Sequence, residues 1–186
     1  MAEIRKLEVE CKAKCSAEKF FSMMTRDALK LPKYAPQTIH NVQVLPGDGE
    51  VRAGSVYIWV YKLVNKPPAV TPKVKVTAVD HKNLSLTLTV IEGYLTDDYT
   101  SFSNTLTTTT QRDGNYNFLV KWSARYQKVN KEVPDPTFVM KMLEDLPRNW
   151  IPICSRNSRL RQDLIIYIDD CTKLQVCAGC LNILDI

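Results

Sequence analysis

The stretch FLVKWSARYQKVNKEVPDPTFVMKMLEDL, residues 118–146, contains the change of pattern that decides the fold. Apolar residues first recur at every second position, which is the spacing of a strand with one buried face. After Pro134 the spacing becomes helical, because Asp135 can cap a helix, Pro136 suits its first position, and an apolar stripe follows. The expected inward side chains are Phe118, Val120, Trp122, Ala124 and Tyr126 on the strand, and Phe138, Val139, Met142, Leu143 and Leu146 on the helix. This order suggests a sheet wrapped around a helix.

Segments with the same two-residue period fill the chain before this stretch. Residues 7–13 alternate in this way, and six strand-like segments follow between 39 and 126, the last one entered through an Asp113-Gly114 turn. Two short helices are expected from residue 16 onward, the second ending before Pro32. The fold class is therefore α+β, with a seven-stranded curved antiparallel sheet around a C-terminal helix, two short helices and an internal hydrophobic cavity.

Prolines are expected to interrupt regular structure at two further places. Pro67 and Pro68 break the strand pattern, since proline cannot donate to a sheet ladder. Pro147 lacks a backbone donor and its ring clashes with the preceding turn, so the last helix should stop there. We therefore divide the chain into a domain at 1–146, with a truncated last helix, and a tail at 147–186.

Composition limits the classes of function. With 186 residues and 45% hydrophobic content, the chain can bury a core of its own. The net charge of +5 comes from Lys and Arg spread singly, without the basic stripe of nucleic-acid binders, so no nucleic-acid partner is expected. Residues 3–8 carry charges, and the longest apolar run, residues 164–168, is too short to span a bilayer. We expect a cytoplasmic monomer without a membrane span, whose six Cys are reduced thiols.

Four short motifs carry a resemblance to a known family. They are LPKYAP at 31–36, VIEGYL at 90–95, VKWS at 120–123 and YQKVNKEVPDP at 126–136. Over residues 1–146 the chain resembles the plant major latex protein family, within the superfamily of the birch major pollen allergen and the class-ten pathogenesis-related proteins. The resemblance implies a helix-grip (START-like) fold and a cavity for a hydrophobic small molecule such as a sterol, fatty acid, hormone or aromatic metabolite. It also implies a role in plant defence or stress responses.

Two segments depart from the pattern of that family. Gly47-Asp48-Gly49 stands where the superfamily has a glycine-rich loop, but residues 50–53 follow where pathogenesis-related members have further glycine. Because no Gly-Lys-Ser/Thr motif and no helix follow, a hairpin turn is favoured over a phosphate loop at Gly47 and Gly49. Family members also continue the last helix, whereas residues 148–186 do not resemble them. A retained intron, a frameshift or a wrong gene model would produce such a change.

Large apolar side chains on the expected inward faces are the candidates for a ligand pocket. Tyr hydroxyls among them could supply the few polar anchors that pockets use. The candidate lining residues are Tyr57, Trp59, Tyr61, Leu86, Leu88, Phe102, Phe118, Val120, Trp122, Tyr126, Phe138 and Met142. The same side chains would also fill an ordinary core, and the sequence leaves both interpretations open.

Cysteines near the end of the chain are the candidates for a metal site. Cys171, Cys177 and Cys180 include a Cys-x-x-Cys pair, but neither a second pair nor a His lies near them in sequence. A structural zinc site needs four soft or imidazole ligands, so unpaired thiols are the favoured interpretation. No metal and no cofactor are expected.

Three acids near the expected cavity mouth, Glu92, Asp97 and Asp98, are the candidates for acid-base chemistry. A solvated hairpin end is the more ordinary interpretation of acids at a turn. Because the sequence has no Ser-His-Asp order and no nucleophile elbow, no catalytic residue is assigned. We therefore expect binding, storage or transport of a hydrophobic small molecule. A cavity enzyme of specialised metabolism using acid-base residues is the alternative, and a ligand-dependent protein-interaction module is the third hypothesis.

Overall fold

The computed structural model describes residues 3–13, 16–36, 38–48, 50–63, 66–110, 118–155 and 175–177. Seven long antiparallel strands form one curved sheet, and two short strands, β4 and β9, are added to it. The strands are β1 (Arg5–Ala13), β2 (Ile39–Leu45), β3 (Val56–Leu63), β4 (Lys66–Val70), β5 (Lys73–Asp80), β6 (Ser85–Glu92), β7 (Tyr99–Thr110), β8 (Phe118–Lys128) and β9 (Gln175–Cys177). Their order across the sheet is β2-β3-β5-β6-β7-β8-β1-β9, and β4 also pairs with β3.

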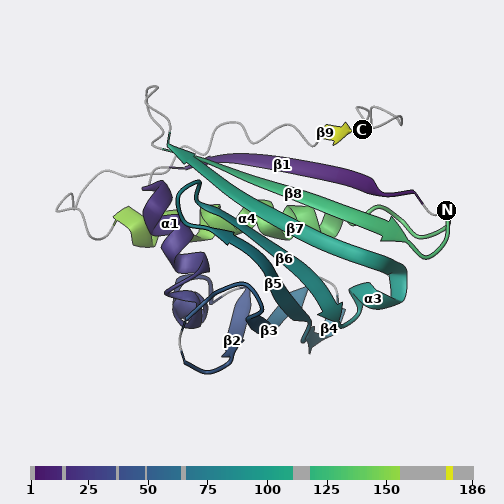
Figure 1. Ribbon diagram of the computed structural model, residues 1–186, viewed down its shortest axis with the longest axis horizontal. Coiled ribbons are helices and arrows are strands. Elements are labelled where there is room, and N and C mark those ends of the chain that lie inside the picture. The colour runs from purple at the N-terminus through teal and green to yellow at the C-terminus, as the bar shows by residue number, and fades with distance from the viewer. Residues whose placement is uncertain are drawn as a thin grey trace.

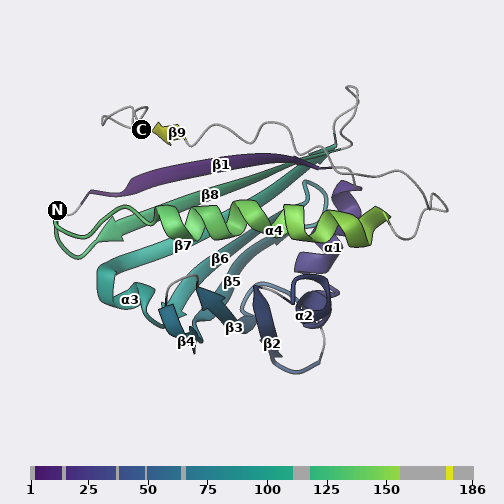
Figure 2. The same cartoon turned by 180° about the vertical axis from the view of Figure 1, so that it is seen from behind.

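The longest helix crosses the concave face of this sheet. Figure 2 shows α4 in front of the strands, with α1 and α2 near one of its ends and α3 near the other, and Figure 1 shows the opposite side. The helical segments are α1 (Ala17–Met24), the 3₁₀ turn η1 (Ala28–Lys30), α2 (Leu31–Tyr34), α3 (Leu95–Asp98) and α4 (Thr137–Ser155). The predicted fold class, a curved antiparallel sheet around a C-terminal helix, is confirmed. Within the described ranges, none of the helices combines the length and apolar character needed to cross a bilayer.

The first helices begin where local chemistry permits them. The Ser16 hydroxyl oxygen caps α1 by accepting a hydrogen bond from the Lys19 backbone N–H at 3.0 Å. The expected helical end before Pro32 is wrong, because Pro32 lies inside the first turn of α2. Proline is tolerated there because its missing N–H would have no intrahelical partner.

The alternation predicted for β8 is confirmed. Phe118, Val120, Trp122, Ala124 and Tyr126 are all buried, while the side chains between them are partly or fully exposed. β8 pairs on one side with β7 and on the other with β1, so it is an interior strand of the sheet, and its five inward side chains belong to the core. Asp113-Gly114, the expected turn before β8, lies outside the described residues.

The expected break at Pro67 and Pro68 is wrong, because both residues belong to the short strand β4. β4 pairs with β3 through Tyr61 opposite Val70 and Leu63 opposite Lys66, so neither proline stands in a paired position of this register. A strand that pairs on one side can hold prolines that a central strand could not. A local sequence pattern does not distinguish an edge strand, which can hold proline, from a central strand, which cannot.

The expected end of the last helix at Pro147 is also wrong. α4 continues through Pro147 and Pro152 to Ser155, and Figure 2 shows it as one continuous helix. Pro147 removes one backbone hydrogen bond, but it is itself buried, and Val139, Leu143 and other apolar residues of α4 are buried with it. Packing of an amphipathic face contributes more to helix stability in proteins than local propensity does, which explains why one proline does not end the helix.

The buried face of α4 is rotated relative to the predicted stripe. Val139, Leu143 and Leu146 are buried as expected, and Met142 is partly buried. Phe138 instead is 38% exposed, and Met140, which the stripe omitted, is fully buried. Two neighbouring residues of a helix differ by about 100° in direction, so a small rotation exchanges which apolar residues face the core.

Candidate functional site

A cavity lies between the concave face of the sheet and α4. On the helix side it is lined by Val139, Met142, Leu143 and Leu146. On the sheet side it is lined by Trp59, Tyr61, Val74, Leu88, Val90, Asn104 and Trp122. Met24, Thr38, Ile39, Pro72 and Leu95 complete the wall. The volume of this cavity, counted as the space that the centre of a water molecule can occupy, is about 70 Å³.

The wall of this cavity is mostly apolar. Among the described residues no Asp, Glu, Lys, Arg or His contributes to it, and its polar side chains are Thr38, Asn104 and the aromatic residues that carry an O–H or N–H. An apolar wall with a few placed polar groups is typical of small-molecule sites. A neutral, largely apolar guest suits such a wall, because a buried charge without a partner is costly.

Tyr61 joins the cavity wall to the region of α3. Its hydroxyl lies 3.0 Å from the hydroxyl of Tyr94, and the Tyr94 ring packs on Phe138 with centroids 5.9 Å apart. Burial raises the pKa of both tyrosines, although the hydrogen bond between their hydroxyls lowers the pKa of Tyr61 in part. Both hydroxyls therefore stay protonated at neutral pH, as hydrogen-bonding groups rather than bases.

The structure places the sequence-predicted lining residues in three environments. Trp59, Tyr61, Leu88, Trp122 and Met142 lie on the cavity wall. Tyr57, Leu86, Phe102, Phe118, Val120 and Tyr126 are buried in the core away from the wall, and Phe138 is partly exposed.

Specific contacts occupy several of the buried residues that are not on the wall. The Tyr57 hydroxyl donates to the Met24 carbonyl oxygen at 2.6 Å, and Phe118 packs on Phe20 with ring centroids 5.6 Å apart. Phe102 and Tyr126 belong to an aromatic cluster with Tyr99, with centroid distances of 5.4 to 6.2 Å. The alternating pattern identifies inward residues but does not distinguish those that fill the core from those that face a cavity.

Asn104 is the wall residue that sequence reasoning missed most clearly. It lies on β7 between Phe102 and Leu106, which are both buried inward residues of the same alternating set. A polar residue within an apolar alternating set was therefore the available signal. Such an interruption indicates either a structural hydrogen bond or a contact to something bound.

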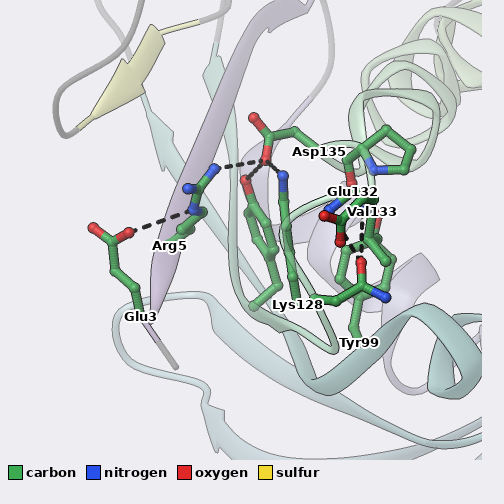
Figure 3. Close-up of polar contacts among 10 residues, drawn as sticks. Glu3, Arg5, Tyr99, Lys128, Glu132, Val133 and Asp135 are labelled. Atoms are coloured by element: carbon green, nitrogen blue, oxygen red, sulfur yellow. Dashed lines mark hydrogen bonds and ion pairs between the residues drawn. The ribbon is translucent and has the colours of Figure 1, made fainter. Parts of the chain in front are cut away.

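A polar cluster fixes the segment that leads into α4 (Figure 3). One carboxylate oxygen of Asp135 accepts hydrogen bonds from the Tyr126 hydroxyl at 2.8 Å and from Lys128 Nζ at 2.7 Å, with Arg5 Nη1 at 3.5 Å. The Tyr99 hydroxyl donates to the Pro134 carbonyl oxygen at 2.8 Å. Partial burial alone would raise the pKa of Asp135, but the hydrogen bonds from Lys128 and Tyr126 and the nearby positive charges lower it.

The same segment is stabilised by its own turn. The Asn130 side-chain oxygen accepts from the backbone N–H groups of Glu132 and Val133, each at 3.1 Å. Together with the contacts of Asp135, this turn sets where α4 begins and hence where its buried face lies over the cavity. The cluster is at the start of the helix and does not line the cavity.

The other candidate groups lie away from the cavity. Glu92, Asp97 and Asp98 are exposed, and Glu92 forms an ion pair with Lys73 at 2.6 Å. None of the three acids lines the cavity.

The glycine segment forms the connection between β2 and β3. Gly47 lies in a turn there, and Gly49 is outside the described residues. Arg52 in this connection pairs with Asp48 at 2.6 Å and Glu50 at 3.2 Å, so its charge is already matched by acids of the loop. This is the geometry of a hairpin connection between two strands, as the sequence favoured.

The candidate metal ligands are mostly beyond the described part of the chain. Cys171 and Cys180 lie outside the described residues, and for Cys177 only the backbone position in β9 is described. Among the residues whose side chains are described, no three His, Cys, Asp or Glu side chains come together in a group that could hold a metal ion.

Sequence and structure comparisons identify proteins similar to this chain. The model of the pathogenesis-related protein Bet v 1 family matches residues 2–150. MLP-like protein 43 from Arabidopsis thaliana is 33% identical over 146 residues, which cover 78% of this chain and 89% of that protein. The crystal structure of major latex-like protein 151 from Panax ginseng has a TM-score of 0.72 at 26% identity, covering 82% of this chain and 97% of the other. Norcoclaurine synthase from Thalictrum flavum, in complex with dopamine and hydroxybenzaldehyde, shares the fold with a TM-score of 0.62 at 19% identity, covering 86% and 90%.

Proposed function

This chain belongs to the pathogenesis-related protein Bet v 1 family, whose members bind hydrophobic ligands, and we propose that it binds, stores or transports a hydrophobic small molecule in the cavity under α4. The observation that carries the proposal is an apolar cavity in which no charged side chain of the described residues contributes to the wall. The proposal includes a cytoplasmic location, as expected from the sequence pattern, and a role in plant defence or stress responses, which the family resemblance implies.

The energetics of such a cavity are compatible with useful affinity. A ligand that buries a few hundred Å² of apolar surface gains roughly 25 cal/mol per Å², and part of this gain is lost to the cost of association. The balance corresponds to a dissociation constant on the order of micromolar. Affinity of this order suits a carrier that must also release its ligand.

The enzyme alternative receives less support from the wall of the cavity. Glu92, Asp97 and Asp98 are exposed and do not line it. Among the described residues, Tyr61 is the titratable side chain that lines the cavity, and burial raises its pKa, so its hydroxyl is a poor base at neutral pH. The likeness to norcoclaurine synthase, at 19% identity, supports the shared fold and does not extend to the reaction.

A pair of substitutions on α4 tests the proposed site. Leu143 lines the cavity, whereas Phe138 lies on the same helix outside the wall. Leu143→Trp should fill the cavity and weaken binding of a neutral solvent-sensitive dye about tenfold or more, whereas Phe138→Trp should leave the dissociation constant unchanged within about twofold. Fluorescence titration of the folded variants measures both values.

Two outcomes would contradict the proposal. One is an equal dye response from the native and the urea-unfolded chain, which would mean that no folded cavity binds the dye. The other is equal weakening by Leu143→Trp and Phe138→Trp, which would place the dye elsewhere on α4.

A further inference from the structure

Two buried polar atoms, on side chains of residues that line the cavity, have no hydrogen-bond partner among the described residues. They are the indole nitrogen Nε1 of Trp122 and the amide oxygen Oδ1 of Asn104. Trp122 is 1% exposed, so its N–H cannot be satisfied by bulk solvent. Buried polar groups in native proteins are nearly always paired, because an unpaired one keeps its desolvation cost. A buried donor and a buried acceptor, left unpaired on neighbouring side chains that line the cavity, therefore point to a guest that completes them.

The strand register brings these two side chains close to each other. β7 and β8 are adjacent antiparallel strands (Figure 1), with Leu106 opposite Trp122 and Asn104 opposite Ala124. Asn104 and Trp122 are thus diagonal neighbours on the concave face of the sheet. Diagonal Cβ atoms are about 7–8 Å apart, a separation that an aromatic side chain and one small ligand group can span.

Other polar groups buried near the cavity already have partners in the protein. The Tyr57 hydroxyl donates to the Met24 carbonyl oxygen at 2.6 Å, and the Thr25 hydroxyl donates to the Phe21 carbonyl oxygen at 2.8 Å. The Tyr61 hydroxyl pairs with that of Tyr94 at 3.0 Å. The unpaired state of Trp122 Nε1 and Asn104 Oδ1 is therefore a local feature of this part of the wall.

The chemistry of the two atoms selects among ligand groups. An indole N–H only donates, and an amide oxygen only accepts. A hydroxyl can satisfy both with one oxygen, because it accepts from Trp122 and donates to Asn104. A carboxylate only accepts and would lose its hydration without a cation on the described wall, whereas a hydrocarbon serves neither atom.

The volume of the cavity indicates the size of a ligand that fits. The space of about 70 Å³ open to water centres can hold at least about five water molecules, since a cavity needs about 10–15 Å³ to hold one. Five molecules of liquid water occupy on the order of 150 Å³, which is the size of a two-ring aromatic molecule.

We propose that the ligand is a neutral aromatic or alicyclic alcohol of one or two rings, whose hydroxyl bridges Trp122 Nε1 and Asn104 Oδ1. This inference rests on the proposed function and specifies its ligand class. It favours neutral alcohols over anionic fatty acids among the classes expected from the sequence.

The test compares three probes of one skeleton by isothermal titration calorimetry. 1-Naphthol carries the hydroxyl, 1-methylnaphthalene replaces it by a methyl group of similar size, and 1-naphthoate carries a carboxylate. 1-Naphthol should bind at least about tenfold more tightly than either of the others, a difference of about 1.4 kcal/mol. Trp122→Phe and Asn104→Leu should each reduce the preference for 1-naphthol over 1-methylnaphthalene to within about twofold.

A matched control separates loss of a hydrogen bond from loss of aromatic volume. Trp59→Phe makes the same change at another tryptophan of the wall. It should alter the affinities for 1-naphthol and 1-methylnaphthalene together and retain their ratio. In the unmutated protein, 1-naphthol should also shift the indole N–H resonance of Trp122 downfield, and 1-methylnaphthalene should not. This measurement needs no variant, so it tests the proposal even if a variant fails to fold.

Each failure has a different meaning. Equal affinities for all three probes, without a selective shift of the Trp122 resonance, would overturn the ligand class and leave the hydrophobic carrier intact. If 1-naphthoate bound most tightly, the proposed class of neutral alcohols would be overturned in favour of anionic ligands. Binding of none of the three, with dye binding also absent, would overturn the proposed function itself.

Discussion

Adjacent residues of β8 experience opposite environments. Trp122 is 1% exposed on the concave face, whereas the side chain of Lys121 is 39% exposed and pairs with Glu8 at 3.2 Å and Glu10 at 3.5 Å. Trp122→Ala should lower the free energy of unfolding by about 3–5 kcal/mol, because it deletes a large core side chain. Lys121→Ala should lower it by at most about 1 kcal/mol, since solvent screens such ion pairs. Urea denaturation measures both, and a larger loss for Lys121→Ala would mean that β8 is displaced by one residue.

Asp135 provides a pH-dependent contribution at the start of α4. Its pKa is lowered in the folded state, because the hydrogen bonds from Lys128 and Tyr126 outweigh the opposing effect of burial. The folded state therefore binds this proton more weakly than the unfolded state, whose Asp pKa is about 3.9. The stabilisation is fully present above that value and is lost as pH falls through the lower folded pKa.

Asp135→Asn should accordingly lower the free energy of unfolding by about 1 kcal/mol at neutral pH, because the carboxylate is partly exposed and its pairs are screened. The difference from the unmutated protein should shrink below about pH 4, where the carboxylate becomes protonated. Urea titrations at pH 7 and about pH 3 measure the free energy of unfolding of each protein. Asp97→Asn, which removes an exposed carboxylate, serves as the control. A deficit that stays constant with pH would mean that the Asp135 charge does not stabilise the fold.

At the scale of elements, α4 is the one that departs most from the sequence-based expectation. Pro147→Ala restores the backbone donor to Leu143 and should raise the free energy of unfolding by about 1–2 kcal/mol, because part of the gain is offset by lost contacts of the buried ring. Urea denaturation monitored by far-UV circular dichroism checks this value. A decrease would show that the proline ring contributes more by packing than the missing hydrogen bond costs.

Element type was predictable where one rule dominates. In β8 the alternation from Phe118 to Tyr126 fixes both strand and face, because no competing signal occurs there. In α4 the sequence could not predict that packing would carry the helix past Pro147, or that Met140 and not Phe138 would face the core. Those outcomes depend on how the helix lies on the sheet, which local patterns do not contain.

The candidate site was predictable only as a set of inward residues. Trp59 and Trp122 lie on the cavity wall, whereas Tyr57 and Phe118, predicted on the same grounds, pack elsewhere in the core. The distinction requires the curvature of the sheet and the position of α4. Asn104 could have been identified as a polar residue within an alternating set of apolar residues. The inference about the class of ligand depends in large part on its unpaired amide oxygen.

For the whole molecule, the division of the chain into a domain and a tail at residue 146 stays a prediction. α4 extends to Ser155 and the family match extends to residue 150, so we expect residues 147–155 to contribute to the domain. Deleting 156–186 should change the free energy of unfolding by less than about 1 kcal/mol, because its described contact is the pairing of three residues of β9 with β1. Deleting 147–186 should cost more, since it shortens α4. Equal losses for the two deletions, measured by urea denaturation, would contradict the expected contribution of residues 147–155 to the domain.

The central claim is that a hydrophobic molecule binds between the sheet and α4. The most direct test is to measure intermolecular nuclear Overhauser effects between 1-naphthol and the methyl groups of the protein. The claim predicts contacts to Val139 and Leu143 on α4 and to Leu88 on β6, which line opposite sides of the cavity. Contacts confined to exposed apolar residues such as Leu29 and Ile91, with none to the cavity methyl groups, would contradict it.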